Sequence, residues 1–138
     1  MQLIPHWSSR LHRVLFAMLL LLTTQAATAA SEAFTEERFK ALQAQGALIL
    51  VDVHADWCPT CAQQQKILDA YEAARPDAAL HRLIVDFDKQ KDWVKHFKAP
   101  RQSTLLLYRG VEQRWFAVAE TREKELFTAL DAAAAPTP

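Results

Sequence analysis

The sequence predicts an α/β fold with a central mixed four-stranded sheet flanked by helices, and three observations carry this prediction. Residues 47–54 form an almost unbroken apolar run, which is typical of a strand covered on both faces. Segments with a helical spacing of apolar residues lie on both sides of this run. Residues 104–118 are typical of a β-hairpin that turns at Arg109 and Gly110. The 138 residues have room for one domain.

The first predicted helix begins at Thr35, because threonine caps helix N-termini and two acidic residues, Glu36 and Glu37, follow it in the first turn. Gly46 provides the stop, since glycine readily takes the left-handed conformation that ends many helices. The apolar run of residues 47–54 follows as the first strand. Its composition places it in the middle of the sheet.

A second predicted helix begins near Cys58, with Pro59 in its first turn, where the N–H that proline lacks would have no helical partner. Pro76 lies just beyond the end of its apolar pattern. Residues 80–87 form the next strand. A strand–helix–strand unit of this kind is a right-handed crossover that leaves its two strands parallel.

The last third of the chain predicts a short helix, a hairpin and a final helix. Residues 89–97 form the short helix, residues 104–108 and 112–118 form the strands of the hairpin, and the final helix begins near Thr121. Because the strands of a hairpin pair antiparallel, the predicted sheet is mixed.

The N-terminus has the pattern of a secretory signal peptide. Arg10 and Arg13 form a basic head, residues 14–22 are apolar, and Ala27-Thr28-Ala29 fits the small-x-small rule for cleavage. The alternative is an uncleaved membrane anchor, but about nine strongly apolar residues fall short of the roughly 20 that span a bilayer. We therefore expect residues 1–29 to be a signal peptide.

Residues 30–138 are expected to form the folded domain, and their charge is close to balanced. Without Arg10 and Arg13, 14 basic and 16 acidic residues remain. This balance gives no indication of a nucleic-acid or anionic-membrane partner. We expect an exported monomer.

The chain has only two cysteines, Cys58 and Cys61. A disulfide across so short a loop constrains the unfolded chain little and therefore adds little stability. A four-cysteine zinc site is excluded by number. The pair must serve redox chemistry, or it must bind a metal with a ligand from elsewhere in the chain.

The position of the cysteines indicates different roles for them. The dipole and free N–H groups of a helix N-terminus favour a thiolate, which makes Cys58 the nucleophile toward a substrate disulfide. Cys61, one turn later, can resolve the mixed disulfide after it loses its proton. Asp52 interrupts the apolar strand, and burial would raise its pKa so that it could accept this proton. The alternative is that Asp52 faces solvent at the end of the strand.

The segment "GALILVDVHADWCPTC" resembles the active-site strand and motif of the thioredoxin superfamily, and "STLLLYRG" resembles the family's next strand and turn. The resemblance implies a thioredoxin-like fold. It implies that Asp52 is the buried acid, Trp57 the active-site tryptophan, Cys58 the nucleophile and Cys61 the resolving cysteine, with a redox disulfide between Cys58 and Cys61. The form "VDVHADWC" is especially similar to thioredoxin-like domains of the bacterial periplasm, which agrees with a signal peptide and implies a periplasmic location.

The sequence also departs from the family pattern. Ser103 stands where the family usually has a cis-proline next to the cysteines. Its peptide bond is therefore expected to be trans, and its hydroxyl could hydrogen-bond a thiolate. On this reasoning Ser103→Pro would raise disulfide reduction. Ile84 replaces a lysine that often neighbours the buried acid, and about five residues before Thr35 leave little room for the N-terminal strand common in the family.

The function expected from the sequence is an exported thiol–disulfide oxidoreductase acting on protein thiols and disulfides, as a reductase or isomerase rather than an oxidase. It would need no cofactor, although electrons would have to come from a membrane-bound donor. Pro59 and Thr60, between the cysteines, help to set its potential. The alternative is a periplasmic copper-type metal-binding module that uses Cys58, Cys61 and His54.

Overall fold

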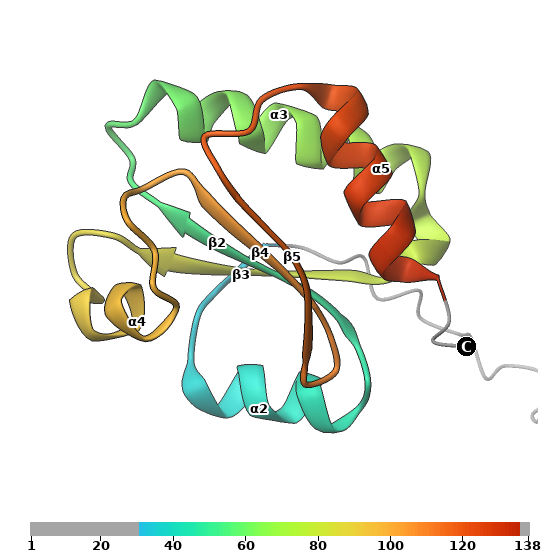
Figure 1. Cartoon of the computed structure of the whole chain (residues 1–138), viewed down its shortest axis with the longest axis horizontal. Coiled ribbons are helices and arrows are strands. Elements are labelled where there is room, and N and C mark those ends of the chain that lie inside the picture. Colours follow the sequence, from blue (N-terminus) through green and yellow to red (C-terminus); the bar gives the residue numbers. More distant parts are fainter. Residues whose placement is uncertain (1–30, 136–138) are drawn as a thin grey trace, which may run out of the picture.

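The computed structural model describes residues 31–135. The elements are β1 (Glu32–Ala33), α2 (Glu36–Ala44), β2 (Leu48–His54), α3 (Pro59–Ala74), η1 (Pro76–Ala78), β3 (Leu80–Asp86), α4 (Lys91–His96), β4 (Thr104–Arg109), β5 (Glu112–Val118) and α5 (Glu123–Ala134). The helices and strands alternate along the chain except at the hairpin of β4 and β5, and one short 3-10 helix follows α3 (Figure 1).

The strands form one mixed sheet in the order β1-β3-β2-β4-β5. β2 lies in the centre, parallel to β3 and antiparallel to β4, and β5 pairs antiparallel with β4. The predicted α/β fold and the central place of the most apolar strand are confirmed.

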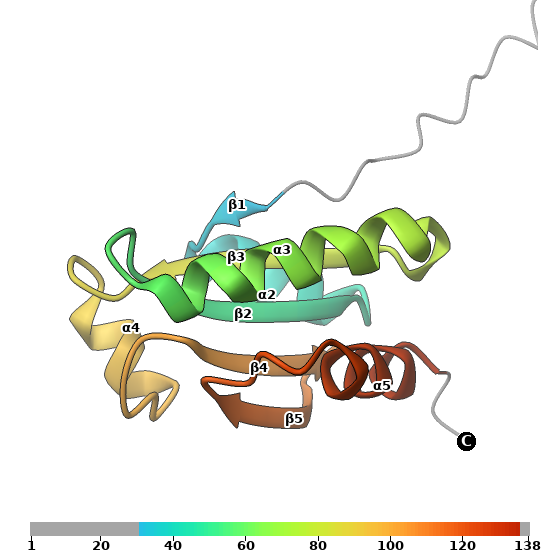
Figure 2. The ribbon, with the colours of Figure 1, turned by 90° about the horizontal axis from the view of Figure 1, so that it is seen from above.

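The sheet has five strands rather than the predicted four, because β1 adds to the outer edge of β3 (Figure 2). Two residues are enough for this strand, since it continues into a backbone hydrogen bond from Phe34 N to Ile84 O of 2.8 Å. The Phe34 ring is buried against Phe39 and Phe97, with ring centroids 5.7 and 5.4 Å away. The ring anchors this edge.

Helices cover both faces of the sheet, with α3 and α5 on one side and α2 and α4 on the other (Figure 1). Alternate residues of β2 enter the two layers, as expected for a strand with a side-chain period of two. Ile49, Val51 and Val53 join the core beneath α2 and α4, whereas Leu48 and Leu50 join the core beneath α3 and α5. Asp52 follows Leu48 and Leu50 on the face toward α3.

Local sequence signals account for the ends of the first helix and for the hairpin turn. The Thr35 hydroxyl accepts the Arg38 N–H at 3.1 Å, so Thr35 caps α2 as predicted. Gly46 and Gly110 both have positive φ, +66° and +58°, which glycine tolerates best. A Cβ at Gly110 would also lie 3.3 Å from the carbonyl oxygen of Gln43, so a side chain here would crowd that oxygen as well as strain the backbone.

No helix within residues 31–135 is long and apolar enough to cross a membrane. The predicted signal peptide and its cleavage site lie outside the residues that the structure describes.

Candidate active site

The two cysteines lie at the start of α3, in the positions that the sequence predicted. Cys58 is the N-cap, Pro59 follows at the first helical position, and the Cys58 sulfur accepts the Cys61 N–H at 3.1 Å. Both are free thiols, 3% and 0% exposed. The helix therefore begins by presenting its unpaired N–H groups to a sulfur atom.

Ser103 brings its hydroxyl between these two sulfur atoms. The Oγ atom lies 3.1 Å from the Sγ of Cys58 and 3.2 Å from the Sγ of Cys61. The peptide bond before Ser103 is trans, as expected, and its φ is +64°. Its N–H donates to Val53 O at 2.8 Å, which extends the β2–β4 ladder to the cysteines.

The surroundings shift the pKa values of the two thiols in opposite directions. Burial alone would raise the pKa of Cys58, but hydrogen bonds from the Cys61 thiol, the Ser103 hydroxyl and the N–H groups of Cys61 and Thr60 hold its pKa below the ordinary value. The pKa of the Cys61 thiol is raised, first by burial and then by its hydrogen bond to Cys58. The structure thus favours a thiolate at Cys58 and a thiol at Cys61.

Asp52 is fully buried on β2, on the side of the sheet that α3 covers. Burial raises the pKa of its carboxyl group, although the charges of His54 and Arg82 and a hydrogen bond from Gln65 oppose this shift. The alternative that Asp52 faces solvent is therefore wrong. Its neighbour on β3 is Ile84, so no lysine accompanies it there.

Most of the sequence matches a known protein family. Residues 30–132 match the sequence model of the thioredoxin family. The chain belongs to the thioredoxin family. Together with the adjacent free thiols, this membership makes it a thiol–disulfide oxidoreductase.

Solved structures agree with the family assignment. The protein Trxlp from Edwardsiella tarda is 37% identical, with a TM-score of 0.69, and the match covers 73% of this chain and 98% of that chain. A thioredoxin from Trypanosoma brucei brucei has a TM-score of 0.67 at 15% identity, covering 80% and 96% of the two chains. Mitochondrial thioredoxin 3 from Saccharomyces cerevisiae has a TM-score of 0.64 at 19% identity, covering 74% and 94%. These two share the fold. No curated protein sequence matches the chain significantly.

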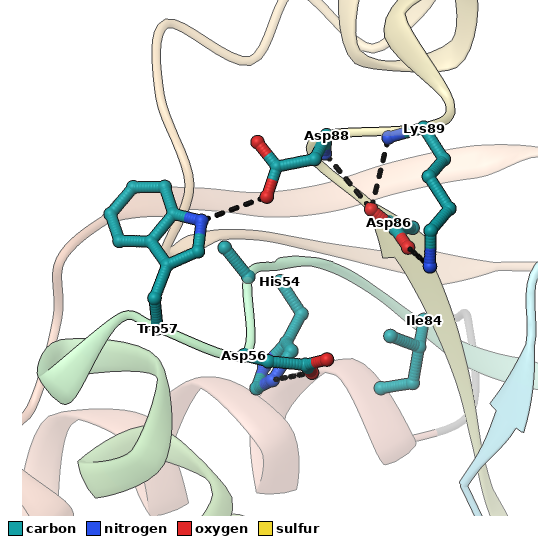
Figure 3. A pocket seen from close by; sticks show the side chains of 8 residues that line it. His54, Asp56, Trp57, Ile84, Asp86, Asp88 and Lys89 are labelled. Atoms are coloured by element: carbon teal, nitrogen blue, oxygen red, sulfur yellow. Dashed lines mark hydrogen bonds and ion pairs between the residues drawn. The ribbon is translucent and has the colours of Figure 1, made fainter.

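Trp57, which the resemblance to the family suggested as the active-site tryptophan, lies at the surface rather than in the core. It is 61% exposed and its indole N–H donates to Asp88 at 2.8 Å. Figure 3 shows the ring at one end of a pocket that His54, Asp86 and Lys89 also line. Trp57 thus remains largely exposed while its hydrogen bond to Asp88 holds the indole ring in place.

The copper-type alternative lacks a third ligand in this geometry. Nε2 of His54 lies 3.6 Å from the carboxylate of Asp56. Within residues 31–135, no group of three or more histidine, cysteine or acidic side chains could hold a metal ion. The three residues of the copper-type alternative, Cys58, Cys61 and His54, are thus not gathered into a metal-binding group within residues 31–135.

Two glutamines of α3 belong to the site, and the sequence reasoning missed both. Gln64 is fully buried and donates to the carbonyl oxygens of Ser103 at 3.2 Å and Glu120 at 3.0 Å. Gln65 donates to the carboxylate of Asp52. They follow Cys61 by three and four residues, a spacing that places them on the same side of a helix. That spacing was the available signal.

Proposed function

We propose that this chain is an exported thiol–disulfide oxidoreductase that exchanges disulfides with protein substrates through Cys58 and Cys61. It works as a reductase or isomerase rather than as an oxidase, and a membrane-bound donor supplies its electrons.

The observation that carries this proposal is the unequal setting of two thiols around the Ser103 hydroxyl. That hydroxyl contacts both sulfurs, yet the pKa of Cys58 is lowered while the pKa of Cys61 is raised. A nucleophile must be a thiolate before it meets its substrate, whereas a resolving thiol is needed only after the mixed disulfide has formed. The lowered pKa of Cys58 therefore suits a nucleophile, and the raised pKa of Cys61 suits a resolving thiol.

The reaction follows in two steps. The Cys58 thiolate attacks one sulfur of a client disulfide, a new S–S bond forms, and the client's other sulfur leaves as a thiolate that takes up a proton. Cys61 then gives its proton to Asp52, and its sulfur attacks the Sγ of Cys58. The client leaves as its second thiolate, and a Cys58–Cys61 disulfide remains. Two electrons have passed from the protein to the client.

A reductase of this kind must be reduced again after each turnover. The periplasm is kept oxidising by proteins linked to the membrane and contains no reducing buffer. The two electrons must therefore come across the membrane, and a membrane-bound protein is the class of donor that can deliver them. The export proposal is supported by the basic, apolar and small-residue pattern of residues 1–29.

The direction of electron transfer, from the protein to its clients or the reverse, is tested by measuring the reduction potential in glutathione buffers, together with insulin-disulfide reduction. Hydrogen bonds to the Cys58 sulfur stabilise the reduced state and by themselves make the disulfide more oxidising. For a reductase we expect a potential closer to the thioredoxin value of about −270 mV than to the oxidase value of about −120 mV. A value near the latter, with oxidation of reduced client proteins, would overturn the proposed direction.

Trapping tests the roles of the cysteines. In Cys61→Ser, client peptides should accumulate in disulfide linkage to Cys58, since the resolving sulfur is gone, and mass spectrometry identifies the linkage. Cys58→Ser is the matched control and should capture none. Capture through Cys61 instead would reverse the assignment.

Export is tested by expressing the full chain in a Gram-negative host and determining the mass of the protein released by osmotic shock. We expect a periplasmic form that begins after Ala29. A full-length product that stays in the cytoplasm would contradict the proposal.

A further inference from the structure

A chain of hydrogen bonds connects Asp52 to a buried arginine. Gln65 Nε2 donates to Oδ2 of Asp52, and Arg82 Nη2 donates to Oε1 of the same Gln65 side chain. The three residues come from β2, α3 and β3. The glutamine therefore links the acid to the guanidinium.

Arg82 is an unusual residue for its place. It is 2% exposed on β3 and faces α3, where Nη1 pairs with Asp69 at 2.6 Å and with Glu72 at 3.3 Å. A buried charge is costly unless it is paired and hydrogen-bonded. The two helix carboxylates pair with Nη1, and Nη2 bonds the glutamine, whereas Nε has no hydrogen-bond partner among residues 31–135.

This connection gives the glutamine amide a fixed direction. A guanidinium can only donate hydrogen bonds, so Gln65 must turn its oxygen toward Arg82 and its NH₂ group toward Asp52. Asp52 is consequently offered a donor at Oδ2 whether or not it carries a proton. Its other oxygen, Oδ1, is buried and has no hydrogen-bond partner among residues 31–135. Oδ1 is the oxygen at which a proton can be received.

We propose that Gln65 and Arg82 are positioning residues for the resolving step, holding Asp52 so that Oδ1 receives the proton of Cys61, directly or through one water. The inference deepens the proposed function and rests on Asp52 being the proton acceptor. Cys61 and Gln65 lie four residues apart on α3, so one face of this helix carries both the proton's source and the group that orients its acceptor.

The groups that face Asp52 determine how its pKa should change when the hydrogen bonds through Gln65 to Arg82 are removed. On its own strand His54 is the nearest titratable residue, from β3 comes the charge of Arg82, and the β4 neighbour is the apolar Leu105. Arg82 and Gln65 both favour the ionised carboxyl group, against burial. Without them Asp52 should hold its proton to higher pH and be a poorer acceptor at neutral pH.

The test uses Gln65→Met, which keeps the length of the side chain but removes both hydrogen bonds. We expect the midpoint of the Asp52 carboxyl titration, followed by ¹³C NMR, to move upward. We expect the single-turnover reduction of a peptide disulfide to slow roughly tenfold or more at pH 7 and to recover as the pH rises, because the hydrogen bond that favours the ionised carboxyl group of Asp52 is lost. Gln63→Met, at an exposed position two residues earlier on the same helix, is the matched control and should change neither.

Two variants of Arg82 distinguish the effect of its charged hydrogen-bond donors from the effect of its volume. Arg82→Lys keeps a charged donor and should preserve the Asp52 midpoint more fully than Arg82→Met. Since Arg82→Met leaves Asp69 and Glu72 without their cation, the decisive variant is Gln65→Met, whose fold is checked by circular dichroism.

The outcomes distinguish this inference from the proposed function. If Asp52→Asn leaves resolution unchanged, the assignment of Asp52 as acceptor fails. If Asp52→Asn slows resolution but Gln65→Met shifts neither the Asp52 midpoint nor the rate profile, the positioning role alone is overturned. In the Asp52→Asn background, Gln65→Met should have no further effect on the rate, and an additive loss would likewise overturn the role.

Discussion

The hydroxyl of Ser103 lies 3.1 Å from the sulfur of Cys58, although 45 positions separate the two residues in the chain. The contact exists because the Ser103 N–H continues the ladder of β4 onto β2 through Val53, which brings the loop against the N-terminus of α3. A residue at the family's usual proline position has here become a hydrogen-bond partner of the thiols.

Removing this hydroxyl should weaken the thiolate of Cys58. In Ser103→Ala the hydrogen bond that lowers the pKa of Cys58 is lost. Because a hydrogen bond to a charged group contributes about 1.5–3 kcal/mol, alkylation of Cys58 by iodoacetamide at pH 6 should slow roughly tenfold. Thr128→Ala, which removes an exposed hydroxyl on α5, is the control and should leave the rate unchanged. Equal rates in Ser103→Ala and the parent would mean that the contact does not act on the thiolate.

Ser103→Pro should destabilise the protein, which reverses the expectation from sequence that it would raise disulfide reduction. Proline fixes φ near −65°, whereas Ser103 has a φ of +64° and uses its N–H to bond Val53. We expect a loss of at least about 2 kcal/mol in the free energy of unfolding, from a lost hydrogen bond and from backbone strain. Urea unfolding measures it. A variant as stable as the parent with faster insulin reduction would restore the sequence-based expectation.

Asp52→Asn should affect both rate and stability, with a defined pH dependence. Replacing the proton acceptor should slow resolution of the mixed disulfide by about two orders of magnitude or more at pH 7. The pKa of Asp52 is raised above 3.8 in the folded protein, so the folded state binds its proton more tightly than the unfolded state does. Stability is therefore lost as the pH rises from about 3.8 through the folded-state pKa.

Asn does not ionise, so the stability gained by Asp52→Asn should be largest at neutral and higher pH and should vanish below about pH 3.8. Urea unfolding at pH 8 and pH 3.5 measures this difference. A gain that is equal at both pH values would show that ionisation of Asp52 is not its cause.

The parts of the fold that the sequence predicted have strong local signals. The apolar run of β2, the Thr35 cap, Pro59 at the first helical position and the glycine at the hairpin turn each determine structure within a few residues of themselves. β1 escaped prediction because its two residues have no period of their own and are held mainly by pairing with β3. Such a strand is decided by its neighbour rather than by its sequence.

The site residues, like the elements of the fold, divide into those that local sequence signals predict and those that depend on distant partners. Cys58 and Cys61 could be placed from the motif, and Asp52 from its conflict with an apolar strand. The spacing from Cys61 could place Gln65 on the side of the helix that faces the site, but its role and that of Arg82 could not be predicted, because they depend on contacts of Gln65 with residues 13 and 17 positions away in the chain. The sequence nevertheless shows a charged residue, Arg82, inside the strand predicted at residues 80–87. Like Asp52 in β2, it needs a partner if the strand is buried.

Gln64 should prove to be the residue that holds the Ser103 loop against α3. Its amide ties the carbonyl oxygens of Ser103 and Glu120 to the helix, and the Ser103 carbonyl also accepts the Ala119 N–H at 2.8 Å. Gln64→Leu retains the volume but leaves the Glu120 carbonyl without this donor, so we expect a loss of about 1–2 kcal/mol and a melting temperature lower by roughly 5–10 °C. Alkylation of Cys58 at pH 6 should slow as well, but less than in Ser103→Ala, since the hydroxyl is still present in a looser loop. Gln63→Leu, at an exposed neighbouring position, controls for the change in helix composition. An unchanged melting temperature together with an unchanged alkylation rate would show that the Ser103 loop is held without Gln64.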